Sequence, residues 1–501
     1  MNRRKFLKVG TAAGLSAALG SRPAMAATAG LPDADARKLP RWRGFNLLEK
    51  FTVSENAPYQ ETDFAWMAEW GFNFARLPMD YRCWAKTPDA DFVEQTLLDI
   101  DQAVDWGRQY GIHISLNFHR GPGYCVNSPK EPGDLWTDPA MQDHFARHWG
   151  VFAKRYKGIP SRQVSFNLIN EPHDVEDAVY AAAMKPAIEG IRAVDSQRLI
   201  IADGLSWGTI PSQALIPFAV AQSTRGYAPF ELSHFQASWI SSPADTPIPV
   251  WPVPVGINNH LFGNGKPDLQ SPLVLQVQCP KPTGFSIHVG HVSAEAELLV
   301  KADGVVVLQH LFKPGPGEGE WKKSVANDWG GYNGDYDTDF EAAIPAGTRE
   351  ITIEVAQGDW LRFSGIRFGE MSIRPTNLDW GVKQEAFIVN ASGVRPAAGD
   401  RYSCSREILL EQRVRPWMQL ASQGVGVHVG EWGAYNRTPH DVALAWMRDC
   451  LENWRTAGFG WALWNFRGAF GVLDSGRKDV KYEEFRGHQL DRRMLDLLRA
   501  S

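Results

Sequence analysis

The chain has 501 residues, a length that favours one large domain accompanied by a smaller one. Hydrophobic residues make up 44% and charged residues 22%, a composition typical of folded proteins rather than of disordered ones. The formal net charge of −5 supplies no basic field, so nucleic acid is excluded as a partner. The 20 tryptophans are a first indication of a sugar-binding protein, since sugar rings stack on exposed aromatic faces.

The N-terminus resembles an export signal. Arg3 and Arg4 precede an apolar run of small residues that ends in the A-x-A cleavage form at residues 24–26. The paired arginines resemble a twin-arginine signal, with Asn2 where Ser or Thr is usual. No later segment has 18 uninterrupted apolar residues. We therefore expect residues 1–26 to be a signal peptide and the mature protein to be periplasmic or extracellular, with no membrane anchor.

The next part of the chain repeats a helix, a glycine stop and a buried strand. Glycines end four predicted helices, at Gly71, Gly111, Gly424 and Gly458, and an apolar strand follows each of them. This alternation predicts an α/β fold, a (β/α)8 TIM barrel. The predicted barrel strands are residues 44–48, 72–77, 113–117, 164–169, 199–202, 230–235, 425–429 and 460–463.

A long segment separates the sixth predicted strand from the seventh. It lacks a helical period, and residues 273–277 and 350–355 instead alternate apolar and polar, as half-buried strands do. Asp303 and Gly304 form a hairpin signal between two such runs. We predict an all-β sandwich inserted between strand 6 and helix 6, loosely similar to carbohydrate-binding jelly rolls. It would be a spacer, or a wall or lid of the cleft.

These patterns predict four consecutive parts of the chain. They are the signal peptide at 1–26, the first part of the barrel at 27–245, the sandwich at 246–375 and the second part of the barrel at 376–501.

Two glutamates follow predicted barrel strands. Glu171 comes after the fourth strand and Glu431 ends the seventh, so both face the mouth where barrel enzymes keep their chemistry. Retaining hydrolysis of a glycoside needs two carboxyl groups about 5 Å apart. We assign Glu171 as acid/base, kept protonated by burial and a neighbouring negative charge, and Glu431 as nucleophile. Asn170 can offer its amide to the sugar 2-hydroxyl.

Outside residues 1–40 and the insert, the sequence resembles glycoside hydrolase family 5, the cellulase-type retaining glycosidases on a (β/α)8 barrel. The resemblance covers residues 41–242 and 378–498. It rests on short phrases in order at predicted strand ends: Gly44 to Leu47, Ala75 to Pro78, Asn117 to His119, Asn170 to Pro172, Gly430 to Trp432 and Trp461 to Trp464.

The resemblance implies further site residues. Arg76 would hydrogen-bond the nucleophile and keep it ionised. His119 would contact a sugar hydroxyl, and Trp464 would be the stacking floor under the sugar at the cleavage point. Each has a structural alternative: a surface ion pair for the arginine, a satisfied histidine and a core tryptophan.

The sequence departs from this family at its predicted sixth strand. Family members commonly have a His, one residue and then a Tyr there, whereas this chain has His234, Phe235 and Gln236. His234 matches, but an amide replaces the phenol that would hold the nucleophile. Gln236 could donate a hydrogen bond to Glu431 or to the sugar, or be a solvated loop residue.

Further aromatic residues could form sugar subsites, and we expect half of those near the barrel strands to belong to the core. Near the strand ends these are Trp42, Trp84, Tyr124, Trp136, Trp207, Trp239 and Trp432. In the insert they are Trp321, Trp329, Tyr332 and Tyr336.

The sequence as a whole predicts a secreted retaining β-glycosidase that needs no cofactor or metal and acts on a β-glucan or related β-linked oligosaccharide. One alternative is a metal-dependent hydrolase using His119, His173 and His234, although no metal-ligand spacing supports it. Another is a non-catalytic glycan-binding protein on a barrel scaffold. A disulfide between Cys83 and Cys125 is left open, as are the oligomeric state, the sugar and the linkage.

Overall fold

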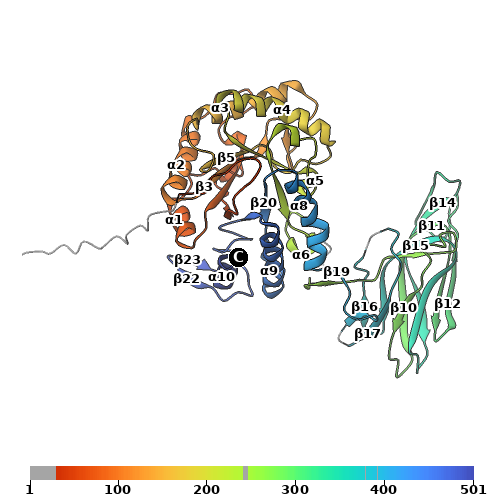
Figure 1. Cartoon of the computed structure of the whole chain (residues 1–501). Coiled ribbons are helices and arrows are strands. Elements are labelled where there is room, and N and C mark those ends of the chain that lie inside the picture. The colour runs from red at the N-terminus through yellow and green to blue at the C-terminus, as the bar shows by residue number, and fades with distance from the viewer. Residues whose placement is uncertain (1–29, 241–245, 378–379, 392) are drawn as a thin grey trace, which may run out of the picture.

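A computed structural model describes residues 30–240, 246–377, 380–391 and 393–501. The predicted signal peptide, residues 1–26, lies outside the described residues. Within the described residues, eight parallel strands close into a barrel, because β1 pairs with both β2 and β21 and β2 pairs with β3 (Figure 1). The barrel prediction is confirmed. Its strands are β1 (Arg43–Asn46), β2 (Phe74–Asp80), β3 (His113–Gly121), β5 (Val164–Asn167), β6 (Leu199–Asp203), β7 (Ala221–Gly226), β20 (Val427–Trp432) and β21 (Gly460–Leu463).

Helices surround this barrel. They bury one face against the strands, as Leu97, Ile100 and Val104 of α2 do. Gly111 ends α2 and Gly458 ends α9 in the left-handed conformation, with φ of 70° and 75°, which glycine adopts without strain. The longer helices are α1 (Glu61–Glu69), α2 (Glu94–Tyr110), α3 (Pro139–Arg155), α4 (Asp177–Val194), α8 (Arg415–Ser422), α9 (His440–Ala457) and α10 (Arg492–Arg499).

Several short elements complete the barrel part. They include β4 (Tyr124–Cys125), α5 (Leu205–Gly208), α6 (Phe230–Ser233), α7 (Arg406–Leu409), β22 (Glu483–Phe485) and β23 (His488–Leu490).

The predicted sixth strand, residues 230–235, is wrong. That segment contains the short helix α6, and the sixth barrel strand is β7. The sequence of β7, Ala-Gln-Ser-Thr-Arg-Gly, has no apolar run because its side chains form buried polar contacts at the barrel mouth. An apolar pattern therefore identified the wrong segment.

A second sheet lies in the chain between β7 and α7, and Figure 1 shows it to one side of the barrel. Its two longest strands, β11 and β15, run antiparallel, and it has a hydrophobic core of its own. Its strands are β9 (His260–Phe262), β10 (Leu273–Gln276), β11 (Thr283–Ala302), β12 (Val305–Phe312), β13 (Lys323–Ala326), β14 (Tyr332–Ile344), β15 (Glu350–Phe368), β16 (Met371–Ile373), β17 (Ala386–Asn390) and β18 (Gly393–Pro396).

The alternating residues lie on strands of this sheet, and the sheet extends beyond the boundary that the sequence suggested. Leu273 and Leu275 are buried, and Asp303 and Gly304 join β11 to β12 with positive φ at both positions, as a tight hairpin requires. The sheet reaches Pro396, so the predicted boundary at residue 375 falls inside it. The strands β17 and β18 are too short for a period of two to identify them. Beyond the sheet, β8 (Val253–Pro254) pairs with β19 (Tyr402–Cys404).

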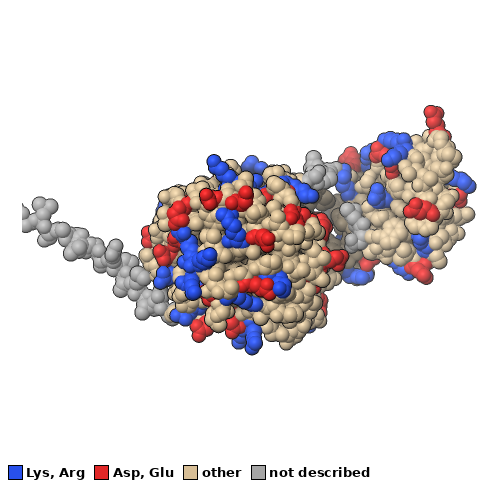
Figure 2. Space-filling view, turned by 90° about the horizontal axis from the view of Figure 1, so that it is seen from above, with Lys and Arg blue, Asp and Glu red and all other residues tan. Residues whose placement is uncertain are grey.

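The surface carries interspersed charges. Figure 2 shows acidic and basic side chains mixed over the visible faces of both parts of the molecule. All five cysteines are free thiols, so the Cys83 to Cys125 disulfide left open above is not formed. No helix among the described residues is long and apolar enough to cross a membrane.

Candidate active site

Charged side chains gather at the carboxyl ends of the barrel strands. Arg76 comes from β2, Asp203 from β6, Arg225 from β7 and Glu431 from β20, while Glu171 follows β5. All of these side chains are at most 15% exposed. Charges removed from water in this way require close partners, and here two arginines meet three carboxylates.

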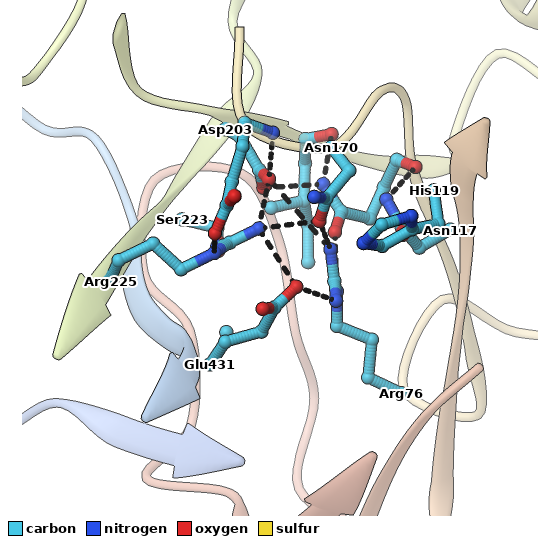
Figure 3. Close-up of polar contacts among 12 residues, drawn as sticks. Arg76, Asn117, His119, Asn170, Asp203, Ser223, Arg225 and Glu431 are labelled. Atoms are coloured by element: carbon cyan, nitrogen blue, oxygen red, sulfur yellow. Dashed lines mark hydrogen bonds and ion pairs between the residues drawn. The ribbon is translucent and has the colours of Figure 1, made fainter. Parts of the chain in front are cut away.

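Glu431 is held by two arginines and a phenol. Its Oε1 lies 2.5 Å from Arg76 Nη1 and 3.2 Å from Arg225 Nη2. The hydroxyl of Tyr227 donates to its Oε2 over 3.3 Å. Figure 3 shows the carboxylate directed between the two arginines. These contacts pair the side chain with two cations and fix its orientation.

Glu171 shares Arg225 with Glu431. Arg225 Nε donates to Glu171 Oε1 over 2.8 Å. The backbone of Glu171 is anchored at both polar groups: its N–H donates to Asp203 Oδ2 over 3.0 Å, and its carbonyl accepts from Tyr124 over 2.6 Å. Its φ of 50° is an unusual conformation for a residue with a side chain, and such strain is characteristic of functional sites.

The two acids differ in surroundings. Burial, and then the charge of Glu431, raise the pKa of Glu171 to about 7, against the opposing effect of Arg225. A carboxyl group with this pKa can hold a proton near neutral pH and release it during a reaction. Glu171 can therefore act as an acid beside a carboxylate that carries its own cationic partners.

Sequence reasoning missed Arg225, Asp203 and Tyr227. Arg225 forms an ion pair with the fully buried Asp203 and reaches both glutamates. Arg225 and Tyr227 were missed because the sixth strand was misplaced. The sequence did hold a signal for Asp203, because this residue directly follows the predicted strand 199–202, and barrel enzymes carry site residues at such positions.

The phenol that seemed to be missing is present. Tyr227 follows β7 and contacts Glu431. The replacement of the phenol by Gln236 was inferred only because the sixth strand had been assigned to the wrong segment. Gln236 is exposed and lies beyond α6. Among the described residues, the hydrogen bond from this region to Glu431 comes from Tyr227. His234 stacks on Phe230 with ring centres 4.1 Å apart.

Asn170 joins the two arginines. Its Oδ1 accepts from Arg76 Nη2 and from Arg225 Nη2, each over 2.8 Å (Figure 3). Its Nδ2 is buried and has no hydrogen-bond partner among the described residues. The amide therefore has a free donor beside the two acids, as expected for a group that binds a ligand oxygen.

His119 and Trp464 form one corner of the site with Phe51. Phe51 lies 4.5 Å from the His119 ring and 5.2 Å from Trp464, measured between ring centres. Burial, and then Arg76 and Arg225, lower the pKa of His119 well below its ordinary value. The imidazole is therefore neutral, so it can either donate or accept a hydrogen bond.

The other aromatic candidates divide into core and surface residues. Trp42, Trp84 and Trp432 are fully buried. Tyr124 is buried and binds the carbonyl of Glu171, with Trp136 packed on it at 4.6 Å between ring centres. Trp207 is 49% exposed and Trp239 61% exposed, so these two remain candidates for sugar stacking.

The three histidines of the metal alternative have separate partners. His173 stacks on Trp207, His234 on Phe230, and His119 lies beside Trp464. In the part of the chain that the structure describes, no three His, Cys, Asp or Glu side chains gather as metal ligands.

Comparison with known proteins finds a family that the first part of the barrel resembles. Residues 33–227 match the profile "Cellulase (glycosyl hydrolase family 5)". Endoglucanase C of Acetivibrio thermocellus is 29% identical over 189 residues, which are 36% of this chain and 54% of that protein. A glucan 1,3-β-glucosidase of Blumeria graminis is 30% identical over 115 residues, 22% of this chain and 27% of that enzyme. The chain thus spans about half the length of the first of these relatives.

Solved structures agree with this placement. One described as a glycoside hydrolase has a TM-score of 0.59 at 26% identity, over 92% of this chain and 99% of that one. Thermotoga maritima Cel5A, in a mutant form with cellobiose, has a TM-score of 0.51 at 15% identity, over 93% and 99%, and shows the likeness of the fold. The match to glycosyl hydrolase family 5 thus covers residues 33–227, which carry Arg76, Asn170, Glu171, Arg225 and Tyr227.

Proposed function

We propose that the protein is a secreted retaining β-glycosidase that hydrolyses a β-glucan or a related β-linked oligosaccharide by double displacement. The observation that carries this proposal is the pair Glu171 and Glu431, which share Arg225 at the barrel mouth. Retaining glycosidases need two close carboxyl groups with different protonation states, and the raised pKa of Glu171, about 7, supplies that difference.

In the first step, Glu431 attacks the anomeric carbon while Glu171 gives its proton to the departing glycosidic oxygen. This step forms a covalent glycosyl ester on Glu431. In the second step, Glu171 takes a proton from water, which attacks the same carbon and releases the sugar. Arg76 and Tyr227 orient Glu431, and the free Nδ2 of Asn170 donates to the sugar 2-hydroxyl.

The substrate class follows from the relatives and from the aromatic residues. The relatives' names include an endoglucanase and a glucan 1,3-β-glucosidase, and both names specify a glucan. In this proposal the ring of Trp464, beside His119, stacks against the sugar at the cleavage point. Trp207 and Trp239 are exposed enough to stack against neighbouring sugars. His119 and His234 then supply neutral hydrogen-bonding groups beside the ring.

The remaining parts of the proposal concern export and domain organisation. Residues 1–26 act as the twin-arginine-type signal that delivers the enzyme to the periplasm or the exterior. The antiparallel domain is a jelly-roll-like sandwich inserted after the sixth barrel strand, between α6 and α7.

A panel of substrates tests the activity. Purified enzyme is incubated with β-1,2-, β-1,3-, β-1,4- and β-1,6-glucans and a β-mannan, with and without EDTA, and reducing ends are measured. We expect release from at least one glucan, with retention of the anomeric configuration by NMR. Release from none, or inverted products, would contradict the proposal; dependence on metal would favour the metal-hydrolase alternative.

The pH dependence should report Glu171. The acid must be protonated, so kcat/KM on an oligosaccharide is expected to fall as the pH rises through about 7, the raised pKa of this group. Glu171→Gln cannot ionise, so its residual turnover of an aryl glycoside with a good leaving group should lack this limb. A basic limb that persists in the Gln variant would assign it to another group.

Removing the Tyr227 hydroxyl should slow the reaction without weakening substrate binding. Tyr227→Phe loses one hydrogen bond to a carboxylate, so kcat is expected to fall by roughly 10- to 100-fold with KM nearly unchanged. Gln236→Ala is the matched control and should retain the parent rate, because Gln236 is exposed. The opposite ranking of the two variants would return the role to Gln236.

A further inference from the structure

The second sheet has a cavity outside the barrel site. Its volume is about 270 Å³, and its lining includes Asn259, His288, Asp337, Arg362 and Ser364. It lies where β11, β14 and β15 run side by side (Figure 1). Arg362 and Ser364 are exposed and alternate with buried Leu361 and Phe363, so the cavity opens on the solvent face of the sheet.

One residue that lines this cavity and the residue next to it in the chain each have a buried polar atom without a hydrogen-bond partner among the described residues. Asn259 lines it and is 8% exposed, and His260 follows directly and is 6% exposed. Asn259 Oδ1 and His260 Nδ1 are buried with no hydrogen-bond partner among the described residues. Buried polar groups in folded proteins are nearly always satisfied, so these two atoms point to a ligand that supplies hydrogen-bonding groups.

An aromatic cluster stands beside these groups. Trp360 occupies the same face of β15 as Arg362, two residues away, and its ring centre is 5.6 Å from that of His260 and 5.4 Å from that of His291. Trp380 packs edge-on against Trp360 at 5.1 Å and is 53% exposed. Exposed tryptophan faces beside a polar cavity suit the apolar face of a sugar ring.

The charges around the cavity select the class of ligand. Arg362 and Asp337 both line the cavity, and Asp337 is already paired with His288 over 2.9 Å and with Lys322. Asp339 lies on the other side of the same imidazole at 2.8 Å. Burial, and then Arg362 and His291, lower the pKa of His260, so it is neutral. An anionic ligand would meet the carboxylate of Asp337 here, and a cationic one would meet Arg362. A neutral ligand rich in hydroxyl groups satisfies both signs.

We propose that this cavity and the Trp360–Trp380 cluster form a second saccharide-binding site, which holds a neutral polysaccharide independently of the barrel. It differs from the sugar face that the sequence suggested in this domain. Of the four aromatics in that prediction, Tyr336 is a core residue packed on Phe312, and Trp329 is 88% exposed without a ring contact among the described residues.

Affinity electrophoresis of the full chain tests the site. The parent carries Glu431→Gln, so that the polymer in the gel is not cut, and the gels contain hydroxyethyl cellulose, laminarin or konjac glucomannan. We expect retardation of the parent in at least one polymer. Trp360→Ala or Arg362→Ala should raise the apparent dissociation constant roughly tenfold, as loss of a stacking or hydrogen-bonding group does. Trp329→Ala is the matched control and should migrate like the parent.

The outcomes separate this site from the barrel chemistry. With Glu431 intact, Trp360→Ala should hydrolyse a short aryl glycoside at the wild-type rate. Because Arg362 is exposed, its variant should fold even if Trp360→Ala does not. The proposed site would be overturned if both variants were retarded like the parent in every gel. It would also be overturned if a further gel with dextran sulfate, an anionic polymer, were the only one to retard the protein. Trp360-dependent binding in an enzyme that hydrolyses no glycoside would uphold the site and reject the proposed function.

Discussion

Replacing Glu431 with alanine is expected to abolish hydrolysis, with a fall in kcat of at least ~10⁴-fold on every β-linked substrate. The carboxylate is the attacking group. Among the described residues Asp203 also contacts both Arg76 and Arg225, but its side chain is fully buried. Without it, the glycosyl ester cannot form, whatever the leaving group. Initial rates on an oligosaccharide and on an activated aryl glycoside, measured against the native enzyme, check this result.

The control for this variant must separate chemistry from folding. Glu431→Ala leaves two buried arginines without one of their partners, which lowers stability as well as activity. Glu431→Gln keeps the shape and can still accept the hydrogen bonds of Arg76. It should melt closer to the native temperature than the alanine variant while remaining as inactive. A near-native rate in either variant would assign the nucleophile to another residue.

The residues at the ends of the apolar strands were the predictable part of the site. Glu171 follows β5 and Glu431 lies at the end of β20, while Arg76 lies within β2 and was indicated by the family resemblance. Parallel barrel strands bring such positions to one mouth, so their proximity follows from the fold alone. The structure brings these three side chains together around Arg225, an arginine that the sequence did not point to.

The rest of the site depended on a strand without a hydrophobic signal. Ser223 and Arg225 point toward the buried charged side chains at the barrel mouth. The sequence of β7 therefore lacks the apolar pattern by which strands are recognised. Phe230, Leu232 and Phe235 offered that pattern slightly later in the chain, although they lie at and beside a short helix. The one-segment shift moved the predicted phenol position from Tyr227 to Gln236.

The second domain shows the same limit. Long alternating strands such as β11 and β15 were visible from their period of two, and the Asp303–Gly304 turn from its residue types. The contacts of its aromatic residues were not visible. Tyr336 and Trp360 both sit on strands, but the one packs into the core and the other stands on the solvent face, a difference set by register.

Replacing Glu171 with alanine should affect substrates unequally, because only a poor leaving group needs its proton. The variant is expected to lose roughly 10²- to 10⁴-fold in kcat/KM on an oligosaccharide and far less on an aryl glycoside with an acidic phenol.

Removing the side chain also frees space beside Arg225 Nε, the cation that Glu171 contacts, so a small anion can enter there. Azide should therefore partly restore turnover of the aryl glycoside and yield a glycosyl azide of retained configuration. Arg225 stays paired with Asp203 in this variant, so the fold should persist. Equal losses on both substrates, with no azide product, would reject the acid/base role, because a group that only supports the site slows every leaving group alike.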